Sequence, residues 1–212
     1  MAKVLPLFQG KDISCTEVTD KELGRISMHK NPNDALAVVK MPDDTATDQP
    51  VADKIINMAS NELVLVLDDM RDPGNMGTII RAADWFGIRQ ILCSPDSVEV
   101  YNPKVIQSTM GAFIRVNVNY HPLADILKAD NAIPVVGAVM DGDSLYSAEL
   151  PGNGFIVIGS ESHGISPEVE SLLTKKISIP SPGSGTESLN ASVATSIILA
   201  EYYRQNSFQT GT

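Results

Sequence analysis

The chain has 212 residues, of which 43% are hydrophobic, and a formal net charge of −10. This length suits one medium-sized domain, with or without a small appendage. The acidic balance argues against a broad, sequence-independent grip on duplex nucleic acid, which needs many Lys or Arg side chains on phosphates. A small cationic pocket within an acidic protein remains compatible with it.

The cysteine content and the hydropathy pattern bear on the cellular compartment. Cys15 and Cys93 are too few for a disulfide framework or a cysteine-based metal site. No uninterrupted apolar run approaches the ~18 residues that a membrane helix needs, and nothing at the start resembles a signal peptide. We therefore expect a cytoplasmic protein that uses neither a membrane nor a metal.

The first 42 residues look like a fragment of a domain. Residues 4–8 and 35–39 are predicted to be short strands, and Thr19–Leu23 has the pattern of a capped helix start. Together these elements are too small to form an independent core.

Residues 43–60 are predicted to be a linker. The stretch that leads into them, MPDDTATDQPVADK at 41–54, is polar and acidic and contains two prolines. The main domain is then expected over residues 61–206.

Strands and helices alternate through the main domain. The run LVLVL at Leu63–Leu67 is continuously apolar, as expected of a strand buried on both faces of a parallel sheet. Further strands are predicted at Gln90–Cys93, Phe113–Val118, Ile133–Met140, Phe155–Ile158 and Ile177–Ile179. Helices are predicted at Met76–Phe86, Lys104–Met110, Leu123–Ala129, Pro167–Leu173 and from about Ser188 onward. This alternation is typical of an α/β protein with a mainly parallel sheet.

The last predicted helix is apolar nearly all round. One stripe holds Leu189, Val193, Ile197 and Ala200, and other apolar residues lie off it. Such a helix is usually covered on more than one side. We expect it to pack against its own sheet and against a second subunit.

Polar residues follow the first buried strand, where open α/β sheets place their ligands. Asn75 is a natural N-cap for the helix that begins there. Arg81 points about 150° away from the buried stripe of this helix, at 100° per residue. It is either a solvated cation or a ligand for a phosphate or a developing oxyanion.

A second polar loop, GSESHGIS, follows the strand FIVI. Gly159 and Gly164 enclose one carboxylate, which suggests a tight turn that aims Glu161 into a crevice. His163 could act as a base, but the sequence places no acidic partner or nucleophile beside it. We interpret it as an ordinary turn residue.

A third polar stretch precedes the last helix. A short strand ends at Ile179 and Pro180, and a Gly-, Ser- and Pro-rich turn follows, in which the backbone can approach a ligand closely. Ser188 and Asn190 are either helix caps or groups that bind a substrate.

Taken in order, these motifs resemble a known family. Asn-x-Gly-x-x-x-Arg-x-Ala, Gly-x-Glu-x-x-Gly, and Ile-Pro followed by Ser-Leu-Asn-x-Ser-Val-Ala are similar to the three motifs of the SpoU-type methyltransferases of the SPOUT superfamily. Those enzymes methylate ribose 2′-hydroxyls of tRNA or rRNA. The resemblance covers Leu63–Arg204, and Val18–Lys40 resembles the end of the small ribosomal-protein-like RNA-binding domain that often precedes it.

The resemblance implies a Rossmann-like, mainly parallel sheet whose C-terminal part forms a deep trefoil knot, a rare exception to the rule against threading. It also implies S-adenosyl-L-methionine as cofactor, a homodimer, and a tRNA or rRNA substrate. The cofactor would contact Gly159, Gly164, Ile179, Pro180 and Leu189. The catalytic residues would be Arg81, Asn75, Glu161, Ser188 and Asn190.

Family precedent gives Arg81 the role of base. A guanidinium is effectively always protonated, so we expect Arg81 instead to anchor a phosphate and to stabilise negative charge on the attacking oxygen.

Two other classes of protein are alternatives. A nucleotide-dependent oxidoreductase should carry Gly-x-Gly-x-x-Gly after its first strand, and Asp72–Asn75 does not match that pattern. A non-catalytic RNA-binding or assembly protein on the same fold would be expected to lack a polar motif residue, and none is lacking. Titration with the methyl donor distinguishes a binding module from an enzyme.

Overall fold

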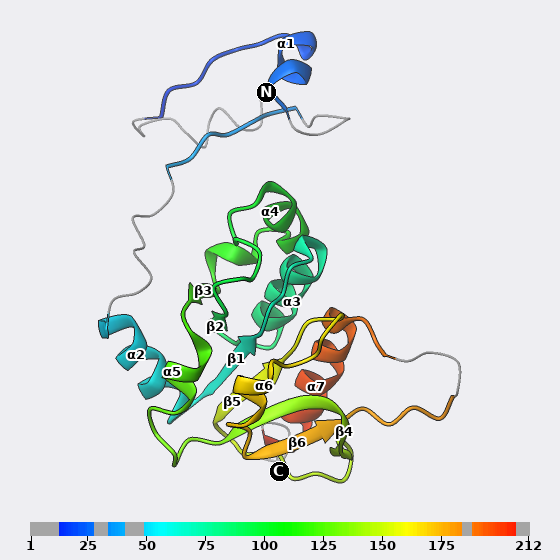
Figure 1. The fold of residues 1–212 in the computed structure, drawn as a ribbon. Coiled ribbons are helices and arrows are strands. Elements are labelled where there is room, and N and C mark those ends of the chain that lie inside the picture. The colour runs from blue at the N-terminus through cyan, green and yellow to red at the C-terminus, as the bar shows by residue number, and fades with distance from the viewer. Residues whose placement is uncertain (1–12, 28–33, 41–48, 184–187, 207–212) are drawn as a thin grey trace, which may run out of the picture. The chain divides into compact units, whose positions relative to one another are not determined.

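The computed structural model describes residues 13–27, 34–40, 49–183 and 188–206. The chain divides into two compact units, residues 1–43 and residues 44–212 (Figure 1). The strand predicted at residues 4–8 lies outside the described residues.

In the first unit, the described residues include the short helix α1 (Asp20–Ile26). Thr19 is its N-cap, and the reciprocal bonds between Thr19 and Glu22 form a capping box, which confirms the predicted helix start. The strand predicted at residues 35–39 is wrong: these residues have no regular secondary structure, and Val38 is 93% exposed. A strand needs a neighbouring strand to bond with, which the local apolar pattern does not supply.

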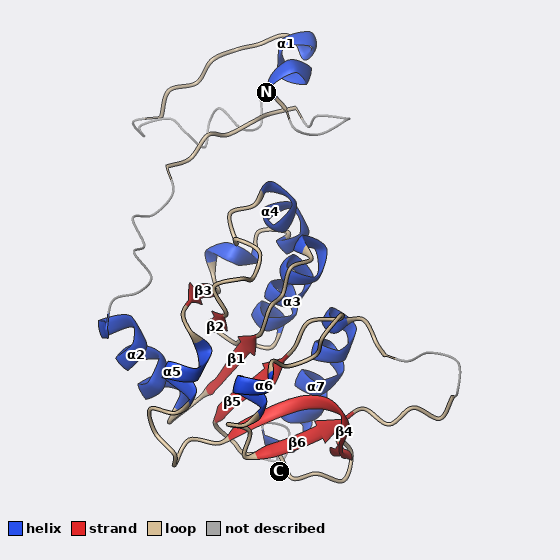
Figure 2. Cartoon of the chain, in the orientation of Figure 1, coloured by secondary structure: helices blue, strands red, loops and turns tan. Residues whose placement is uncertain are grey.

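The second unit is built on a six-stranded parallel sheet (Figure 2). Its strands are β1 (Leu63–Leu67), β2 (Gln90–Cys93), β3 (Asn117–Tyr120), β4 (Val135–Ser144), β5 (Gly154–Ile158) and β6 (Lys175–Ser178). They lie in the order β3-β2-β1-β5-β4-β6. The predicted parallel α/β sheet is confirmed, and the trefoil knot stays a prediction.

Helices cover both faces of the sheet (Figure 1). They are α2 (Gln49–Ala59), α3 (Pro73–Trp85), α4 (Pro103–Thr109), α5 (Leu123–Leu127), α6 (Pro167–Glu170) and α7 (Ala191–Asn206), with a 3₁₀ turn at Ala112–Ile114. The side chains of β1 alternate between two cores, because successive strand residues point to opposite faces. Leu63, Leu65 and Leu67 pack with α3 and α7, whereas Val64 and Val66 pack with α2 and α5.

The expected linker is partly helical. Residues 49–59 form α2, whose Ala52, Ile55 and Ala59 are buried in the core beneath β1 and α5. The linker prediction is therefore wrong for these residues. Ala52, Ile55 and Ala59 recur at the spacing of one helix face, but this pattern begins inside a polar stretch that contains proline and therefore looks like a linker. The proline does not prevent the helix, because it is tolerated in the first helical turn.

Several other element boundaries differ from the prediction, among them those of β3 and of the last helix. The strand expected at Phe113–Val118 is a 3₁₀ turn followed by β3, which begins only at Asn117. The last helix begins at Ala191, because Asn190 caps it: its Oδ1 accepts bonds from the backbone N–H groups of Ser192 and Val193.

The C-terminal end of α7 is fastened to the loop that precedes β5. The Tyr202 hydroxyl donates to the Gly152 carbonyl over 2.6 Å, and the Gln205 side chain bridges two backbone groups of the same loop. The buried Glu201 accepts bonds from Arg204 and Gln205, which lower its pKa to about 2.

Among the described residues, no helix combines the length and the hydropathy of a membrane-spanning segment.

Replacing Glu201 by glutamine is expected to lower the free energy of unfolding by on the order of 1 kcal/mol at pH 7, since Arg204 is half exposed. A carboxyl whose folded-state pKa is depressed contributes stability above its ordinary pKa of 4.5 and loses it as pH falls towards 2. Urea unfolding at several pH values should therefore show the gap between wild type and variant narrowing below pH 4.5. Glu149→Gln, at an exposed carboxylate of the adjoining loop, is the control.

Candidate active site

Three loops meet at the carboxyl ends of neighbouring strands. The β1–α3 loop and the β5–α6 loop lie side by side because β1 and β5 are paired, and the segment after β6 reaches the same edge on its way to α7. Strand order reverses between β1 and β5. Open α/β sheets bind their ligands in the crevice at such a switch point.

Asn75 does not cap α3, contrary to the sequence prediction. The N-cap is Asp72, whose Oδ1 accepts from the Asn75 backbone N–H over 2.7 Å, and Pro73 occupies the first turn. The acidic side chain is closer to the unsatisfied N–H groups of the helix and takes that role. The amide of Asn75, which is 7% exposed, is thereby left to bond across the fold.

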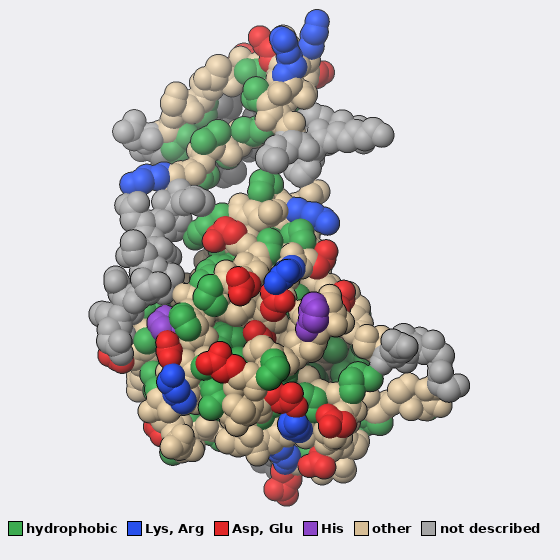
Figure 3. Space-filling view, in the orientation of Figure 1, with side chains coloured by type: hydrophobic (Ala, Val, Ile, Leu, Met, Phe, Trp, Pro, Cys, Tyr) green, Lys and Arg blue, Asp and Glu red, His purple; other side chains and the backbone are tan. Residues whose placement is uncertain are grey.

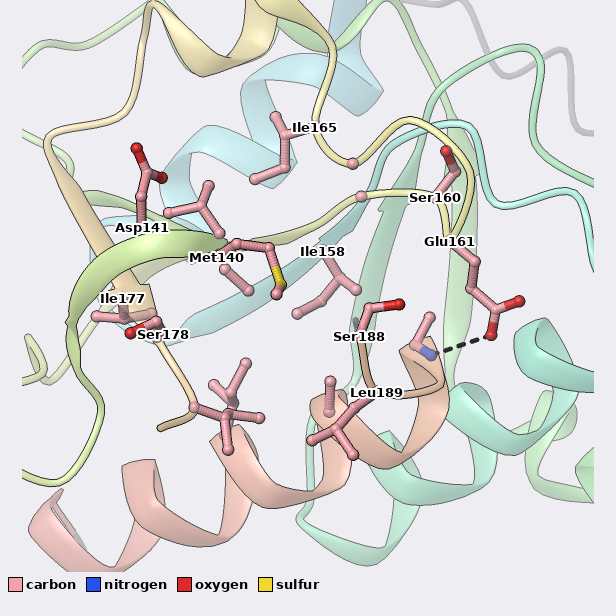
Figure 4. A pocket seen from close by; sticks show the side chains of 18 of the residues that line it. Met140, Asp141, Ile158, Ser160, Glu161, Ile165, Ile177, Ser178, Ser188 and Leu189 are labelled. Carbon is pink, nitrogen blue, oxygen red and sulfur yellow. Dashed lines mark hydrogen bonds between the residues drawn. The ribbon is translucent and has the colours of Figure 1, made fainter. Parts of the chain in front are cut away.

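One carboxylate ties the three loops together. Glu161 Oε1 accepts bonds from Asn75 Nδ2 over 3.0 Å and from Asn190 Nδ2 over 2.7 Å. Asn190 Nδ2 also donates to Asn75 Oδ1 over 2.8 Å, and the Ala191 N–H donates to Glu161 over 3.3 Å (Figure 4). Residues 115 positions apart in the chain are thus in direct contact.

A tight turn presents Glu161. Ser160 and Gly164 bond to each other through both of their backbone N–H groups, each over 3.0 Å. Gly164 has a φ of +70°, which glycine adopts without strain. A Cβ on Gly159 would lie 2.1 Å from the Gly164 carbonyl carbon, so only glycine allows this turn to close. The predicted glycine-flanked turn is confirmed.

The larger cavity, of about 530 Å³, lies between the β4 end, the β5–α6 loop and the start of α7 (Figure 4). Its wall is mostly apolar and includes Ile158, Ile177 and Ile198. All five residues predicted to contact a cofactor line it, namely Gly159, Gly164, Ile179, Pro180 and Leu189. Ser188 and Glu161 line it as well. The size is that of a small-molecule site, in the usual range of about 300–1,000 Å³.

A smaller cavity, of about 210 Å³, adjoins the larger one. The β1–α3 loop supplies Asp69, Met70, Arg71, Asp72 and Asn75, and the β5–α6 loop supplies Ser160, Glu161, Ser162 and His163. Ser160, Glu161 and His163 line both cavities and form the boundary between them. Apart from Met70, the residues that line the smaller cavity carry polar or charged side chains.

Arg81 lines neither cavity. It lies on the exposed face of α3, and its guanidinium takes part in none of the hydrogen bonds or ion pairs found among the described residues. The structure therefore brings together Asn75, Glu161 and Asn190, places Ser188 in the cavity wall, and leaves Arg81 at the surface with its charge available.

The sequence reasoning missed the contribution of β4 to the site. Met140 and Asp141 stand at the rim of the larger cavity, where the register of β4 against β6 shifts between Ala138 and Asp143. Glu170 of α6 lies in the wall and bonds with Lys176, whose pKa it raises. No sequence motif identifies these residues. Met140 and Asp141 reach the cavity because of how β4 pairs with β6, and that pairing cannot be read from the local sequence.

Asp68, at the end of β1, also escaped the sequence reasoning. It is buried, and its Oδ2 accepts from the Ser166 backbone N–H over 2.7 Å, which joins the first strand to the start of α6. Within residues 13–27, 34–40, 49–183 and 188–206, no cluster of three or more His, Cys, Asp or Glu side chains has the arrangement of a metal site.

Residues 62–200 match the model of the SpoU rRNA Methylase family. The chain is 31% identical over 193 residues to a 23S rRNA (uridine(2479)-2′-O)-methyltransferase of Streptomyces viridochromogenes, covering 87% of this chain and 64% of that protein. It is 37% identical over 155 residues to the 23S rRNA (guanosine-2′-O-)-methyltransferase RlmB of Blochmanniella floridana, covering 70% of this chain and 60% of that protein. The chain thus spans less than two thirds of these relatives.

A solved structure agrees with the fold. The SpoU methyltransferase AviRb of Streptomyces viridochromogenes, in complex with AdoMet, matches with a TM-score of 0.63 and 30% identity. The match covers 68% of this chain and 60% of that one.

Proposed function

The chain belongs to the SpoU rRNA methylase family, and on this premise we propose that it transfers a methyl group from S-adenosyl-L-methionine to a ribose 2′-hydroxyl of tRNA or rRNA. The observation that carries the proposal is the convergence of Asn75, Glu161 and Asn190 beside a cavity of about 530 Å³. These are the polar residues of three motifs, and they meet at the ligand-binding edge of the sheet.

The larger cavity suits the methyl donor. Apolar side chains from β5, β6 and α7 provide a wall for an adenosyl group, and Gly159 and Gly164 let the backbone close tightly around it. Asp141, Glu161 and Glu170 add carboxylates to the lining. When bound, S-adenosyl-L-methionine supplies a cationic sulfonium whose methyl is open to attack by an oxygen, and negative charge in the lining favours that cation.

The protein's own residues would hold the acceptor. Methyl transfer requires the attacking oxygen to be in line with the donor methyl and nearly in contact with it, so positioning is the main task. Glu161 fixes the amides of Asn75 and Asn190. Ser188 in the wall of the larger cavity would help to orient the ribose where it meets the donor, and Arg81 would bind a neighbouring phosphate and stabilise negative charge on the oxygen.

Calorimetric titration with S-adenosyl-L-methionine and a tritiated-methyl transfer assay on total RNA from a deletion strain test the function. Donor binding together with ribose methylation is expected. Mass spectrometry of the same RNA should show a 2′-O-methyl site that is absent from the deletion strain and restored by the protein. Donor binding without transfer to any RNA would favour the non-catalytic alternative, and absence of both would contradict the proposal.

The proposal includes a homodimer. The stripe of α7 that was predicted to be covered is open in the single chain: Leu189 is 47% exposed and Val193 is 46% exposed. A second copy of the chain packed on this stripe would remove both from water. Light scattering of wild type and of Val193→Glu tests this, with a dimer expected for the former and a monomer for the latter.

The remaining inferences follow from the family. The trefoil knot would form where the segment between β6 and α7 passes through the fold, and we propose that the enzyme acts in the cytoplasm. Residues 1–42 would be the remnant of an RNA-binding domain. Acidic side chains are spread over the face shown in Figure 3, with Lys and Arg between them, so RNA contact would depend on local cations such as Arg81.

A further inference from the structure

We propose that His163 accepts the proton of the ribose 2′-hydroxyl during methyl transfer. This inference rests on the proposed function and adds to it the base that the reaction requires. The sequence alone favoured an ordinary turn residue. The fold gives His163 a different setting, because it lines both cavities at their common boundary.

The boundary is where the reaction has to take place. If the donor occupies the larger, apolar cavity, an acceptor ribose in the smaller, polar cavity meets the methyl across Ser160, Glu161 and His163. As the oxygen–methyl bond forms, the sulfur–carbon bond breaks and its electron pair stays on sulfur, while the hydroxyl proton leaves oxygen for an imidazole nitrogen. The products are the 2′-O-methyl ribose, a neutral thioether and an imidazolium.

Of the three boundary side chains, the imidazole is the only nitrogen base, and unlike the Glu161 carboxylate it takes no part in holding the loops together. Glu161 Oε1 is occupied by three donors and fastens the loops. The Ser160 hydroxyl is a poor base, and its Oγ accepts from the His163 backbone N–H over 3.2 Å. Within the described structure, the imidazole of His163 has no hydrogen-bond partner, so both ring nitrogens are free for substrate and solvent.

The charged groups that line the two cavities beside His163 are mostly carboxylates. They are Asp69, Arg71 and Asp72 from the β1–α3 loop, Glu161 from the same loop as His163, and Asp141 and Glu170 in the larger cavity. Arg71 is paired with Asp69 over 2.6 Å. His163 is exposed, so the proton can then pass to water.

The test compares His163→Gln with wild type in single-turnover transfer of tritiated methyl to total RNA from a deletion strain, at saturating donor and between pH 5 and 9. A group that must be unprotonated to accept a proton makes the rate fall as that group is protonated. Wild type should show a rate that falls on the acid side. His163→Gln should be slower by about 10²-fold or more, as is typical for loss of a general base, and should lose that acid limb. Calorimetry should show unchanged donor binding.

His121→Gln is the matched control. His121 follows β3 at the far edge of the sheet, and its ring contacts only the Pro122 carbonyl among the described residues. It should keep the wild-type rate and pH profile. A His163→Gln enzyme that is as fast as wild type, or slower with the acid limb intact, overturns the inference. A wild-type protein that methylates no RNA at any pH would instead refute the proposed function.

Discussion

Arg81→Ala is expected to lower methyl transfer by about 10²–10³-fold, the usual cost of losing a group that stabilises charge in a transition state, while donor binding stays unchanged. The backbone of Arg81 is about 9 Å along the axis of α3 from that of Asn75, at a rise of 1.5 Å per residue. Arg81 lines neither cavity, so the donor does not depend on it. It is exposed and unpaired within the described structure, so its removal should not destabilise the fold.

The measurements are donor titration and tritiated-methyl transfer on the same preparation. Arg81→Lys keeps the positive charge but lacks the paired N–H donors of the planar guanidinium. It should therefore be more active than Arg81→Ala but less active than wild type. Arg89→Ala removes another exposed arginine, at the opposite end of the sheet beside the start of β2, and should behave as wild type. A fully active Arg81→Ala enzyme would refute the assignment of a phosphate- or oxyanion-binding role.

Gly159→Ala is expected to abolish binding of S-adenosyl-L-methionine. The added Cβ would lie 2.1 Å from the carbonyl carbon of Gly164 and 2.3 Å from the backbone nitrogen of Ile165. These are backbone atoms that cannot rotate away, so the turn has to open. Opening it moves Glu161, which holds the amides of Asn75 and Asn190, and displaces one wall of the larger cavity.

Calorimetry and thermal unfolding distinguish a local from a global effect. Overpacking of this kind commonly costs about 1–3 kcal/mol, so the variant should remain folded at 25 °C but bind no donor. Gly152→Ala is the control, because its Cβ would meet nothing closer than the Asn206 side chain at 3.6 Å. Wild-type donor affinity in Gly159→Ala would show that this turn does not shape the donor site.

Local patterns in the sequence were enough to predict the strands that are buried on both faces of the sheet. The runs at Leu63–Leu67 and Phe155–Ile158 are short, continuously apolar and rich in β-branched residues, which favours central parallel strands. The amphipathic pattern of α3 and the glycine-flanked turn around Glu161 are similarly local. The choice of Asn75, Glu161 and Asn190 as site residues depended on the order of three motifs.

Only the tertiary structure decided which of these residues meet and what each one does. Asn75 and Asn190 are joined because β1 pairs with β5 and the chain after β6 returns to the same edge, which no local pattern encodes. Asp72, and not Asn75, caps α3, so the side chain of Asn75 is available to bond with Glu161. The position of His163 between two cavities depends on loops that are brought together only by strand order. Propensity and hydrophobic period act over a few residues, whereas a site is made by contacts between segments far apart in the chain, and those are fixed only when the sheet assembles.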